Sequence, residues 1–211
     1  SCYTYLISDR GAYDTFPLTA GNGSYTLQVL ENVAGDTYTV SLTQSINISI
    51  EDEFLPFLYP NQYVNFHADS QAVSKGCDLA KDTYSDLDVV QNIYNYVIKN
   101  ISYDTEKAQN VSYGYVPDVD DTLSSKKGIC FDYAALMTSM LRSQNIPTKL
   151  EVGYSGDAYH AWISTYIDDK GWVDDIIQFD GDTWQIMDPT LAATNDSAAV
   201  KKYVGDGSHY V

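Results

Sequence analysis

The sequence predicts an α+β protein in which a small β-rich region precedes a core of helices followed by strands. Three observations indicate this class. Residues alternate with a period of two from Ser24 to Ile50, helical periodicity follows over 70–101 and 130–143, and alternation returns after Pro147. We therefore expect an accessory β-rich region over residues 1–60 and a core over residues 61–211.

The composition is that of a folded and strongly acidic protein. Hydrophobic residues make up 44% of the 211 residues, which is enough for a core, and no apolar run approaches the roughly 18 residues of a membrane span. The net charge of −17 disfavours binding to nucleic acid or to anionic membranes. Tyrosine is abundant, lysine is sparse and no signal segment is visible. We expect a monomer located outside the cell or at its surface, whose signal segment is absent from this chain.

The alternating runs near the N-terminus predict a small antiparallel sheet. The residues that share a face in each run are Tyr25, Leu27 and Val29, then Tyr38, Val40 and Leu42, then Ile46, Ile48 and Ile50. The segment Asn32–Asp36, which contains Gly35, is typical of a hairpin loop. Because this region holds no histidine and no candidate nucleophile, we expect it to have an accessory or substrate-presenting role.

Two helices are predicted ahead of the third cysteine. Ser70 is a candidate N-cap of the first, which should bury Val73, Cys77 and Ala80. Ser85 and Asp88 resemble a capping pair for the second. The apolar stripe of the second helix is formed by Leu87, Val90, Tyr94, Val97 and Ile101. From Ser102 to Lys127 the periodicity fades, so we expect a long irregular segment with a functional role.

The chain has three cysteines, Cys2, Cys77 and Cys130, so at least one thiol is unpaired in a monomer. A disulfide between Cys2 and Cys77 is one alternative. The helical pattern around Cys77 favours the other, a free thiol packed in the core.

The third helix is predicted to begin at Cys130 and to end near Ser143. Apolar side chains recur at spacings of three and four, so one face should be buried; they are Tyr133, Leu136, Met137, Met140 and Leu141. Asn145 is a candidate left-handed C-cap, and Pro147 forbids continuation of the helix.

Strands follow the third helix. In the first, Leu150, Val152 and Tyr154 alternate with polar neighbours; in the next, one face carries Ala161, Ile163, Thr165 and Ile167, and the other carries His160, Trp162 and Ser164. The segments 168–171 and 179–182 are turn signals. The last alternating run is Trp184, Ile186 and Asp188, before Pro189.

Three residues in these elements have side chains suited to nucleophilic chemistry. Cys130 opens a helix, where unsatisfied backbone N–H groups stabilise a thiolate and can bind an oxyanion. His160 begins an apolar strand downstream, which suits a base. Asp188 ends a strand and can accept a hydrogen bond from an imidazole. Each residue alone also fits an ordinary structural role.

Three motifs in this order resemble the transglutaminase-like superfamily, in its bacterial secreted form. They are GICFDYAALMTSMLRSQNIP (128–147), HAW (160–162) and DPT (188–190), and ISYD (101–104) resembles the segment before the nucleophile loop. The resemblance covers Leu87–Thr190, about half of the chain. It implies a papain-like core in which the helix that bears the nucleophile packs on an antiparallel sheet.

The resemblance also implies roles for the three residues. Cys130 would be the nucleophile, His160 the general base and acid, and Asp188 the orienting acid. The thiolate would attack an amide carbonyl and form a thioester, which passes to water or to an amine. The expected activity is that of a cysteine-dependent peptidase or amidase, acting on polypeptide or cell-wall amide bonds without a cofactor.

Residues around the nucleophile are candidates for supporting roles. The backbone N–H of Cys130 is one expected oxyanion donor. Candidates for a second donor are Tyr103, Tyr113 and Tyr115. Trp162 is expected to form a wall of the substrate cleft, and Asp132 to serve the N-terminus of the third helix.

Three alternatives remain open at the level of sequence. Cys, His and Asp also bind zinc, although no CxxC or HxxxH spacing supports a zinc site. The same fold could capture a peptide without turning it over. Acyl transfer to an amine, as opposed to hydrolysis, depends on which molecule the cleft admits.

Overall fold

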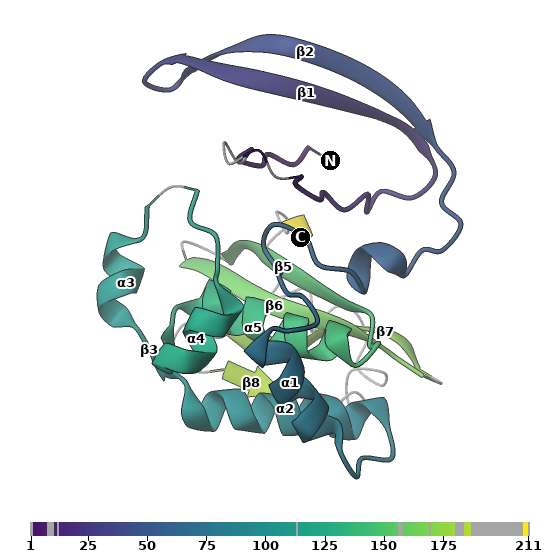
Figure 1. The fold of residues 1–211 in the computed structure, drawn as a ribbon, viewed down its shortest axis with the longest axis vertical. Coiled ribbons are helices and arrows are strands. Elements are labelled where there is room, and N and C mark those ends of the chain that lie inside the picture. The colour runs from purple at the N-terminus through teal and green to yellow at the C-terminus, as the bar shows by residue number, and fades with distance from the viewer. Residues whose placement is uncertain are drawn as a thin grey trace.

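A computed structural model describes residues 2–7, 11, 13–112, 114–155, 158–168, 170–179, 184–186 and 209–210. It has the mixed helical and sheet architecture that the sequence predicts, with a separate antiparallel strand pair near the N-terminus (Figure 1). None of the helices in the described ranges combines the length and the apolar character that crossing a bilayer requires. The proposed boundary between residues 60 and 61 stays a prediction.

The core is built on a five-stranded antiparallel sheet in the order β8-β7-β6-β5-β9. Its strands are β5 (Thr148–Ser155), β6 (Ala158–Ile167), β7 (Gly171–Phe179), β8 (Trp184–Ile186) and β9 (His209–Tyr210). Asp168 and Lys170, from the turn predicted over 168–171, lie between β6 and β7, while Asp169 lies outside the described residues. Leu150, Ala161 and Ile163 are fully buried and belong to one apolar cluster with helix α5 (Cys130–Ser143).

Helix α5 has the predicted bounds, but it is more deeply buried than its sequence suggests. All residues from Asp132 to Arg142 are buried, not only those of one apolar face. The reason is that α5 lies between the sheet and the helices α1 (Gln71–Ala80), α2 (Asp86–Asn100) and α4 (Val119–Ser125). Polar Thr138 and Ser139 are therefore enclosed as completely as Leu136.

The C-terminal end of α5 is fixed by two features. Asn145 has a φ of 63°, which confirms the predicted left-handed cap. Arg142 is buried; its Nε donates to the Thr148 carbonyl oxygen at 2.9 Å, and its Nη1 donates to the Tyr59 carbonyl oxygen at 2.9 Å. Burial lowers the pKa of Arg142 to about 9. These bonds fix α5 to β5 and to the segment that leaves the N-terminal region.

Helix α1 buries a different stripe from the predicted one. Ala72 and Gly76 are its buried residues, whereas Cys77 is exposed. The small side chains let α1 approach α5 closely, since a Cβ atom at Gly76 would lie 3.1 Å from the Met140 carbonyl oxygen. Cys2 is also free and exposed, so the predictions of a packed Cys77 and of a possible Cys2–Cys77 disulfide are both wrong.

Helix α2 begins as predicted. The Ser85 side chain accepts from the backbone N–H of Asp88 at 3.2 Å, and its hydroxyl donates to the Asp88 carboxylate at 2.8 Å. The buried residues of the helix are Val89, Val90, Ile93 and Val97. The predicted stripe was therefore only partly right, because Leu87 and Tyr94 are half-buried.

The segment between Ser102 and Lys127 is structured, contrary to the prediction of a long irregular stretch. It contains β3 (Ser102–Tyr103), α3 (Thr105–Asn110), α4 and β4 (Lys127–Gly128). Aspartate side chains cap both helices: Asp104 accepts from the backbone N–H of Lys107, and Asp118 from those of residues 120 and 121. Helices of six and seven residues are too short to show a periodic apolar stripe.

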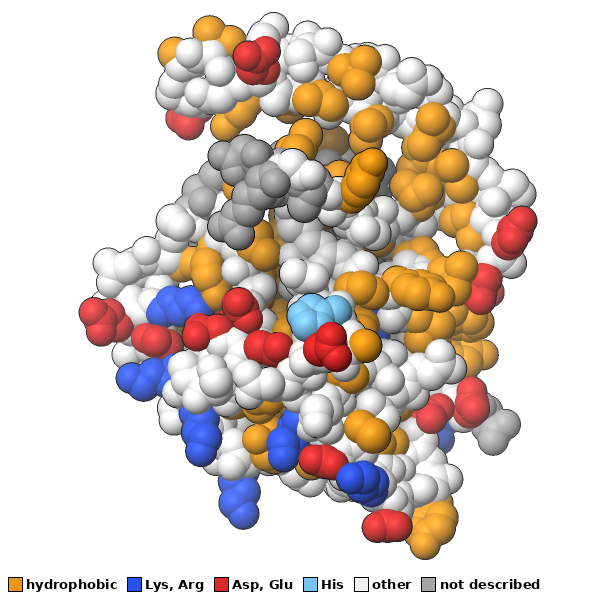
Figure 2. All heavy atoms as spheres, in the orientation of Figure 1, with side chains coloured by type: hydrophobic (Ala, Val, Ile, Leu, Met, Phe, Trp, Pro, Cys, Tyr) orange, Lys and Arg blue, Asp and Glu red, His pale blue; other side chains and the backbone are white. Residues whose placement is uncertain are grey.

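The N-terminal strand pair consists of β1 (Gly23–Ala34) and β2 (Thr37–Ile48). The second alternating run and the third as far as Ile48 form one strand, and Ile50 lies beyond it. The turn contains only Gly35 and Asp36 because the strands continue through the predicted loop. In Figure 1 this hairpin arches over the segment that begins the chain. Its apolar residues are largely exposed, Leu42 by 51% for example, and Figure 2 shows hydrophobic side chains along it.

Candidate active site

The site is built where two short strands meet the start of α5. The parallel pair β3 and β4 places Tyr103 opposite Gly128, two residues before Cys130. The backbone N–H of Ser102 donates to the Lys126 carbonyl oxygen, and that of Asp104 to the Gly128 carbonyl oxygen, both at 2.9 Å. The chain that follows α2 is thereby held beside the turn that carries the thiol.

Cys130 is the first residue of α5, as predicted, and its side chain is partly accessible. The backbone N–H groups of Phe131 and Cys130 lie near the sulfur and act to lower the pKa of the thiol. Burial outweighs them and raises the pKa of the Cys130 thiol to about 11, with a further contribution in the same direction from Asp132. The position of Cys130 at a helix start suggests an acidic thiol. The helix start alone does not produce one, because burial has the larger effect on the pKa.

Gly128 has a packing role in this turn. A Cβ atom at this position would lie 2.7 Å from the Asp132 Cβ and 3.2 Å from its Oδ2. The absence of a side chain at residue 128 lets the Asp132 side chain fold back towards the start of its own helix. The Asp132 Oδ2 accepts from the backbone N–H of Ile129 at 2.8 Å, which is the helix-start role predicted for this residue.

Asp132 also has two partners from outside its own helix. Lys107 of α3 donates from Nζ to Oδ2 at 2.8 Å, and the Tyr115 hydroxyl donates to Oδ1. Lys107 Nζ also donates to the Tyr115 oxygen. Because the Asp132 side chain is fully buried and that of Lys107 is 29% exposed, the ion pair extends from the surface into the interior. Sequence reasoning missed Lys107, which lies 25 residues upstream of Asp132 without any local pattern.

The candidate tyrosines have different surroundings. The Tyr103 hydroxyl accepts a hydrogen bond from the Cys130 backbone N–H, and burial together with the charge of a Cys130 thiolate raises the pKa of Tyr103. The Tyr115 hydroxyl donates to Asp132; burial and this bond raise the pKa of Tyr115 above its usual value. Tyr113 lies outside the described residues.

The partners predicted for the thiol are described only in part. His160 lies in β6, where its backbone pairs with Gly153, and its ring is not among the described side chains. Asp188 lies outside the described residues. Trp162 is 6% exposed, and its buried Nε1 has no acceptor among the described residues. The assignment of Cys130, His160 and Asp188 to one site stays a prediction.

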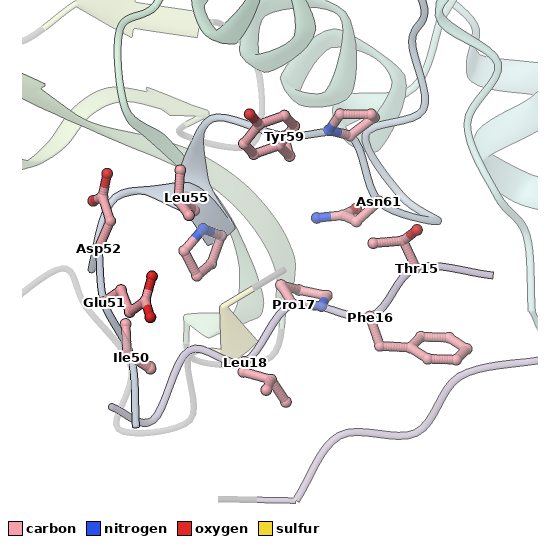
Figure 3. A pocket seen from close by; sticks show the side chains of 12 residues that line it. Thr15, Phe16, Pro17, Leu18, Ile50, Glu51, Asp52, Leu55, Tyr59 and Asn61 are labelled. Carbon is pink, nitrogen blue, oxygen red and sulfur yellow. The ribbon is translucent and has the colours of Figure 1, made fainter. Parts of the chain in front are cut away.

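A cavity of about 290 Å³ lies elsewhere, between the segment 15–18 and the connector 50–61. Figure 3 shows its wall, in which Phe16, Leu18, Leu55 and Tyr59 accompany the acidic Glu51 and Asp52. Cys130, the candidate catalytic residue whose side chain the structure describes, is not among the residues that line this cavity.

Comparison with known proteins identifies the part of the chain that contains this site. The family model described as Transglutaminase-like superfamily matches residues 72–174, a range that holds Cys130 and His160 and ends before Asp188. Residues 72–174 belong to the transglutaminase-like superfamily. The match is consistent with the resemblance carried by the GICFDYAAL and HAW motifs.

Two curated relatives are similar to part of the chain. The UPF0252 protein MJ1282 of Methanocaldococcus jannaschii is 32% identical over 98 residues, which are 41% of this chain and 28% of that protein. Kyphoscoliosis peptidase of Mus musculus is 29% identical over 106 residues, which are 44% of this chain and 16% of that protein. The chain thus spans less than a third of either relative.

A solved structure is similar over most of the chain. It is that of a candidate cysteine protease from Cytophaga hutchinsonii, with a TM-score of 0.48 and 15% identity over 93% of this chain and 74% of that one.

Proposed function

We propose that the protein is a cysteine-dependent hydrolase that cleaves peptide or other amide bonds through a thioester at Cys130. The observation that carries this proposal is the position of Cys130 at the first turn of a buried helix, with a partly accessible side chain and two backbone N–H groups at its sulfur. Membership of the superfamily and a relative named a peptidase support the same reaction type.

The proposed reaction needs a cationic partner for the thiol. Burial raises the pKa of Cys130 to about 11, so that little thiolate is present at neutral pH unless a positive charge stabilises it. We assign this charge to the imidazolium of His160, oriented by Asp188. The helix start then contributes to the stabilisation of the thiolate, while the ion pair provides most of it.

The bonds form and break in two stages. The Cys130 sulfur attacks the carbonyl carbon, the C–N bond breaks, and His160 gives its proton to the departing amine. Water, deprotonated by His160, then attacks the thioester and releases the acid together with the thiol. We assign the Cys130 backbone N–H and the Tyr103 hydroxyl as the groups that stabilise the oxyanion, because both lie beside the Cys130 thiol, where the oxyanion would form.

We do not assign this second donor role to Tyr115, because its hydroxyl proton is already directed at a buried carboxylate. Trp162 is proposed to wall the substrate cleft, because it is a large buried side chain two residues beyond His160.

The test is a screen of peptides and cell-wall fragments with the wild-type chain and with Cys130→Ala. We expect wild type to accumulate an acyl adduct that maps to Cys130 and to release a free amine, while Cys130→Ala does neither. Cys77→Ala is the matched control and should behave as wild type, because Cys77 is an exposed thiol outside the site. Binding without an adduct or a product would favour a silent peptide-binding module.

Hydrolysis and acyl transfer are separated in the same screen by adding a primary amine. Transfer gives a new amide that contains the added amine, while hydrolysis gives the carboxylic acid. We propose hydrolysis as the main outcome; dominant formation of the new amide would contradict it.

A further inference from the structure

Lys107 and Tyr115 are two residues near the thiol that the proposed reaction does not use. Both belong to the segment between α2 and β4, and both contact the carboxylate of Asp132. Asp132 is the third residue of the helix that Cys130 begins, and it accepts from the backbone N–H of Ile129, the residue before Cys130. The contacts therefore connect the surface of α3 to the backbone on both sides of the thiol.

We propose that Lys107 and Tyr115 are positioning residues for the nucleophile, acting through the buried carboxylate of Asp132 on the Ile129–Cys130 turn. This inference rests on the proposed function, since it concerns the same thiol. Neither residue is proposed to touch the substrate.

The backbone of Ile129 controls the direction in which the Cys130 N–H group points. Ile129 is the N-cap residue, with φ −92° and ψ 176°, and its ψ sets the direction of the Cys130 N–H that is proposed to bind the oxyanion. Asp132 fixes Ile129 through a 2.8 Å hydrogen bond. Because Lys107 and Tyr115 hold both oxygens of Asp132, the carboxylate cannot rotate away from this bond without breaking another.

The charge of Asp132 also affects the thiol. Its negative charge lies next to the thiol and opposes ionisation of Cys130. Lys107 places a positive charge 2.8 Å from the same carboxylate. The pair therefore keeps the orienting carboxylate while reducing the penalty that it imposes on the thiolate. A buried carboxylate without such a partner would also be costly to the fold.

The start of α3 makes a further contact with the nucleophile turn. Asp104 caps α3 by accepting from the Lys107 backbone N–H at 2.9 Å, and the Asp104 N–H itself donates to the Gly128 carbonyl oxygen at 2.9 Å. The first turn of α3 is therefore attached to β4 by its backbone, while the Lys107 side chain reaches Asp132. This double attachment explains how a short helix can hold a side chain in a fixed place beside the nucleophile turn.

The experiment measures how fast iodoacetamide alkylates Cys130 as a function of pH, in the full chain with Cys2→Ser and Cys77→Ser. Both replaced thiols are exposed and would otherwise react as well. The groups that face the thiol are Tyr103 from β3, Asp132 from α5 and, as proposed, His160 from β6. Lys107→Met, Lys107→Arg and Tyr115→Phe are compared with Lys99→Met, which removes an exposed lysine from the end of α2.

We expect Lys107→Met to slow alkylation at neutral pH by about three- to tenfold and to move the profile to higher pH, because less of the thiol is ionised. Lys107→Arg should restore most of the rate, since it keeps the charge. Tyr115→Phe should give a change of about twofold in the same direction, and Lys99→Met should give none. A substrate, once known, should show a loss in kcat with KM unchanged for Lys107→Met.

The inference is overturned if folded Lys107→Met has the same alkylation profile as Lys99→Met. If Lys107→Met does not fold, Tyr115→Phe decides: an unchanged profile overturns the inference, and a shift to higher pH supports it. The His160→Ala variant separates this result from the proposed function. An unchanged profile in His160→Ala contradicts the Cys130–His160 pair, while the effect of Lys107 is still read on the thiol itself.

Discussion

Helix α5 and the β1–β2 hairpin show how similar apolar patterns can lead to opposite environments. Leu136 of α5 is 0% exposed, whereas Leu42 of β2 is 51% exposed. Both belong to regular apolar patterns in the sequence, one helical and one alternating. The difference is that α5 is enclosed by the sheet and three helices, while the hairpin strands pair with each other. Periodicity identifies an element, but the elements packed around it decide its burial.

The comparison also separates the two regions by function. The candidate nucleophile begins the most enclosed helix of the described chain, where the surrounding packing holds its position. The hairpin, with its exposed apolar residues, lies outside the range that matches the superfamily. Its expected accessory role stays a prediction.

The largest difference in stability between the two regions should appear when one leucine of each, Leu136 or Leu42, is truncated to alanine. Leu136→Ala should lower the free energy of unfolding by about 3 kcal/mol or more, because it leaves a cavity in a packed interior. Leu42→Ala should cost less than about 1 kcal/mol, because the side chain is already half in water. Urea unfolding of both variants measures this. Equal losses would mean that the hairpin contributes to the core more than its exposure indicates.

Glycine substitutions sharpen the comparison, because the two regions need glycine for different reasons. Gly128→Ala should cost about 1–3 kcal/mol, since the new methyl group would overlap Asp132. Gly35→Ala in the hairpin turn has free space around it and a φ of 54°, so only the backbone opposes it, by about 1 kcal/mol. Gly128→Ala should also slow alkylation of Cys130, and Gly35→Ala should not. Similar alkylation rates in the two variants would argue against the packing role of Gly128.

A smaller effect is expected from removing side-chain hydroxyls. Ser85→Ala should cost about 1 kcal/mol, because the N-cap bond to the backbone of Asp88 is lost. Ser41→Ala in the hairpin removes an exposed bond to the Val29 carbonyl oxygen and should cost less than about 0.5 kcal/mol. Thermal unfolding of the pair reports the difference. A larger loss from Ser41→Ala would reverse the expected ranking of the two regions.

The smallest expected effect is a loss of folding stability at alkaline pH. The Tyr133 hydroxyl donates to the Ile101 carbonyl oxygen at 2.6 Å, and burial raises the pKa of Tyr133 to about 12. Because the folded pKa is above the unfolded value of 10.0, ionisation favours unfolding, and stability should fall as pH rises from about 10 towards 12. The loss accumulated up to a pH of about 10 should be about 0.4 kcal/mol. Tyr133→Phe should make the decline less steep; an unchanged slope would contradict this assignment.

The sequence predicted the start of α2 and both ends of α5 well because the signals there are local. Cys130 at the start, Asn145 as the left-handed cap and the capping pair at Ser85 all depend on residues within one or two turns. The buried face of α1 was predicted wrongly because Ala72 and Gly76 carry little hydrophobic signal, although their small size permits close packing. The helices α3 and α4 were missed because each is too short for a periodic pattern.

The surroundings of the candidate site could be predicted less completely, for a physical reason. The contact between Lys107 and Asp132 joins residues that lie far apart in the sequence, and neither spacing nor composition indicates it. The role of Asp132 at the helix start was predicted because it depends only on the three residues before it. The raised pKa of Cys130 also differs from the expectation that the helix start stabilises a thiolate. The reason is that the desolvation of Cys130 depends on tertiary burial.

In this account, burial holds the Cys130 thiol in its neutral form, and His160 converts it into a nucleophile. The most direct measurement is a pH titration of the Cys130 thiolate by its ultraviolet absorbance, as the difference between the Cys2→Ser, Cys77→Ser chain and the same chain with Cys130→Ala. We predict that the thiolate forms well below the ordinary pKa of a cysteine, about 8.5, and that His160→Ala shifts its formation to much higher pH. A thiol that titrates near 11 in both chains, as burial alone dictates, would contradict the account.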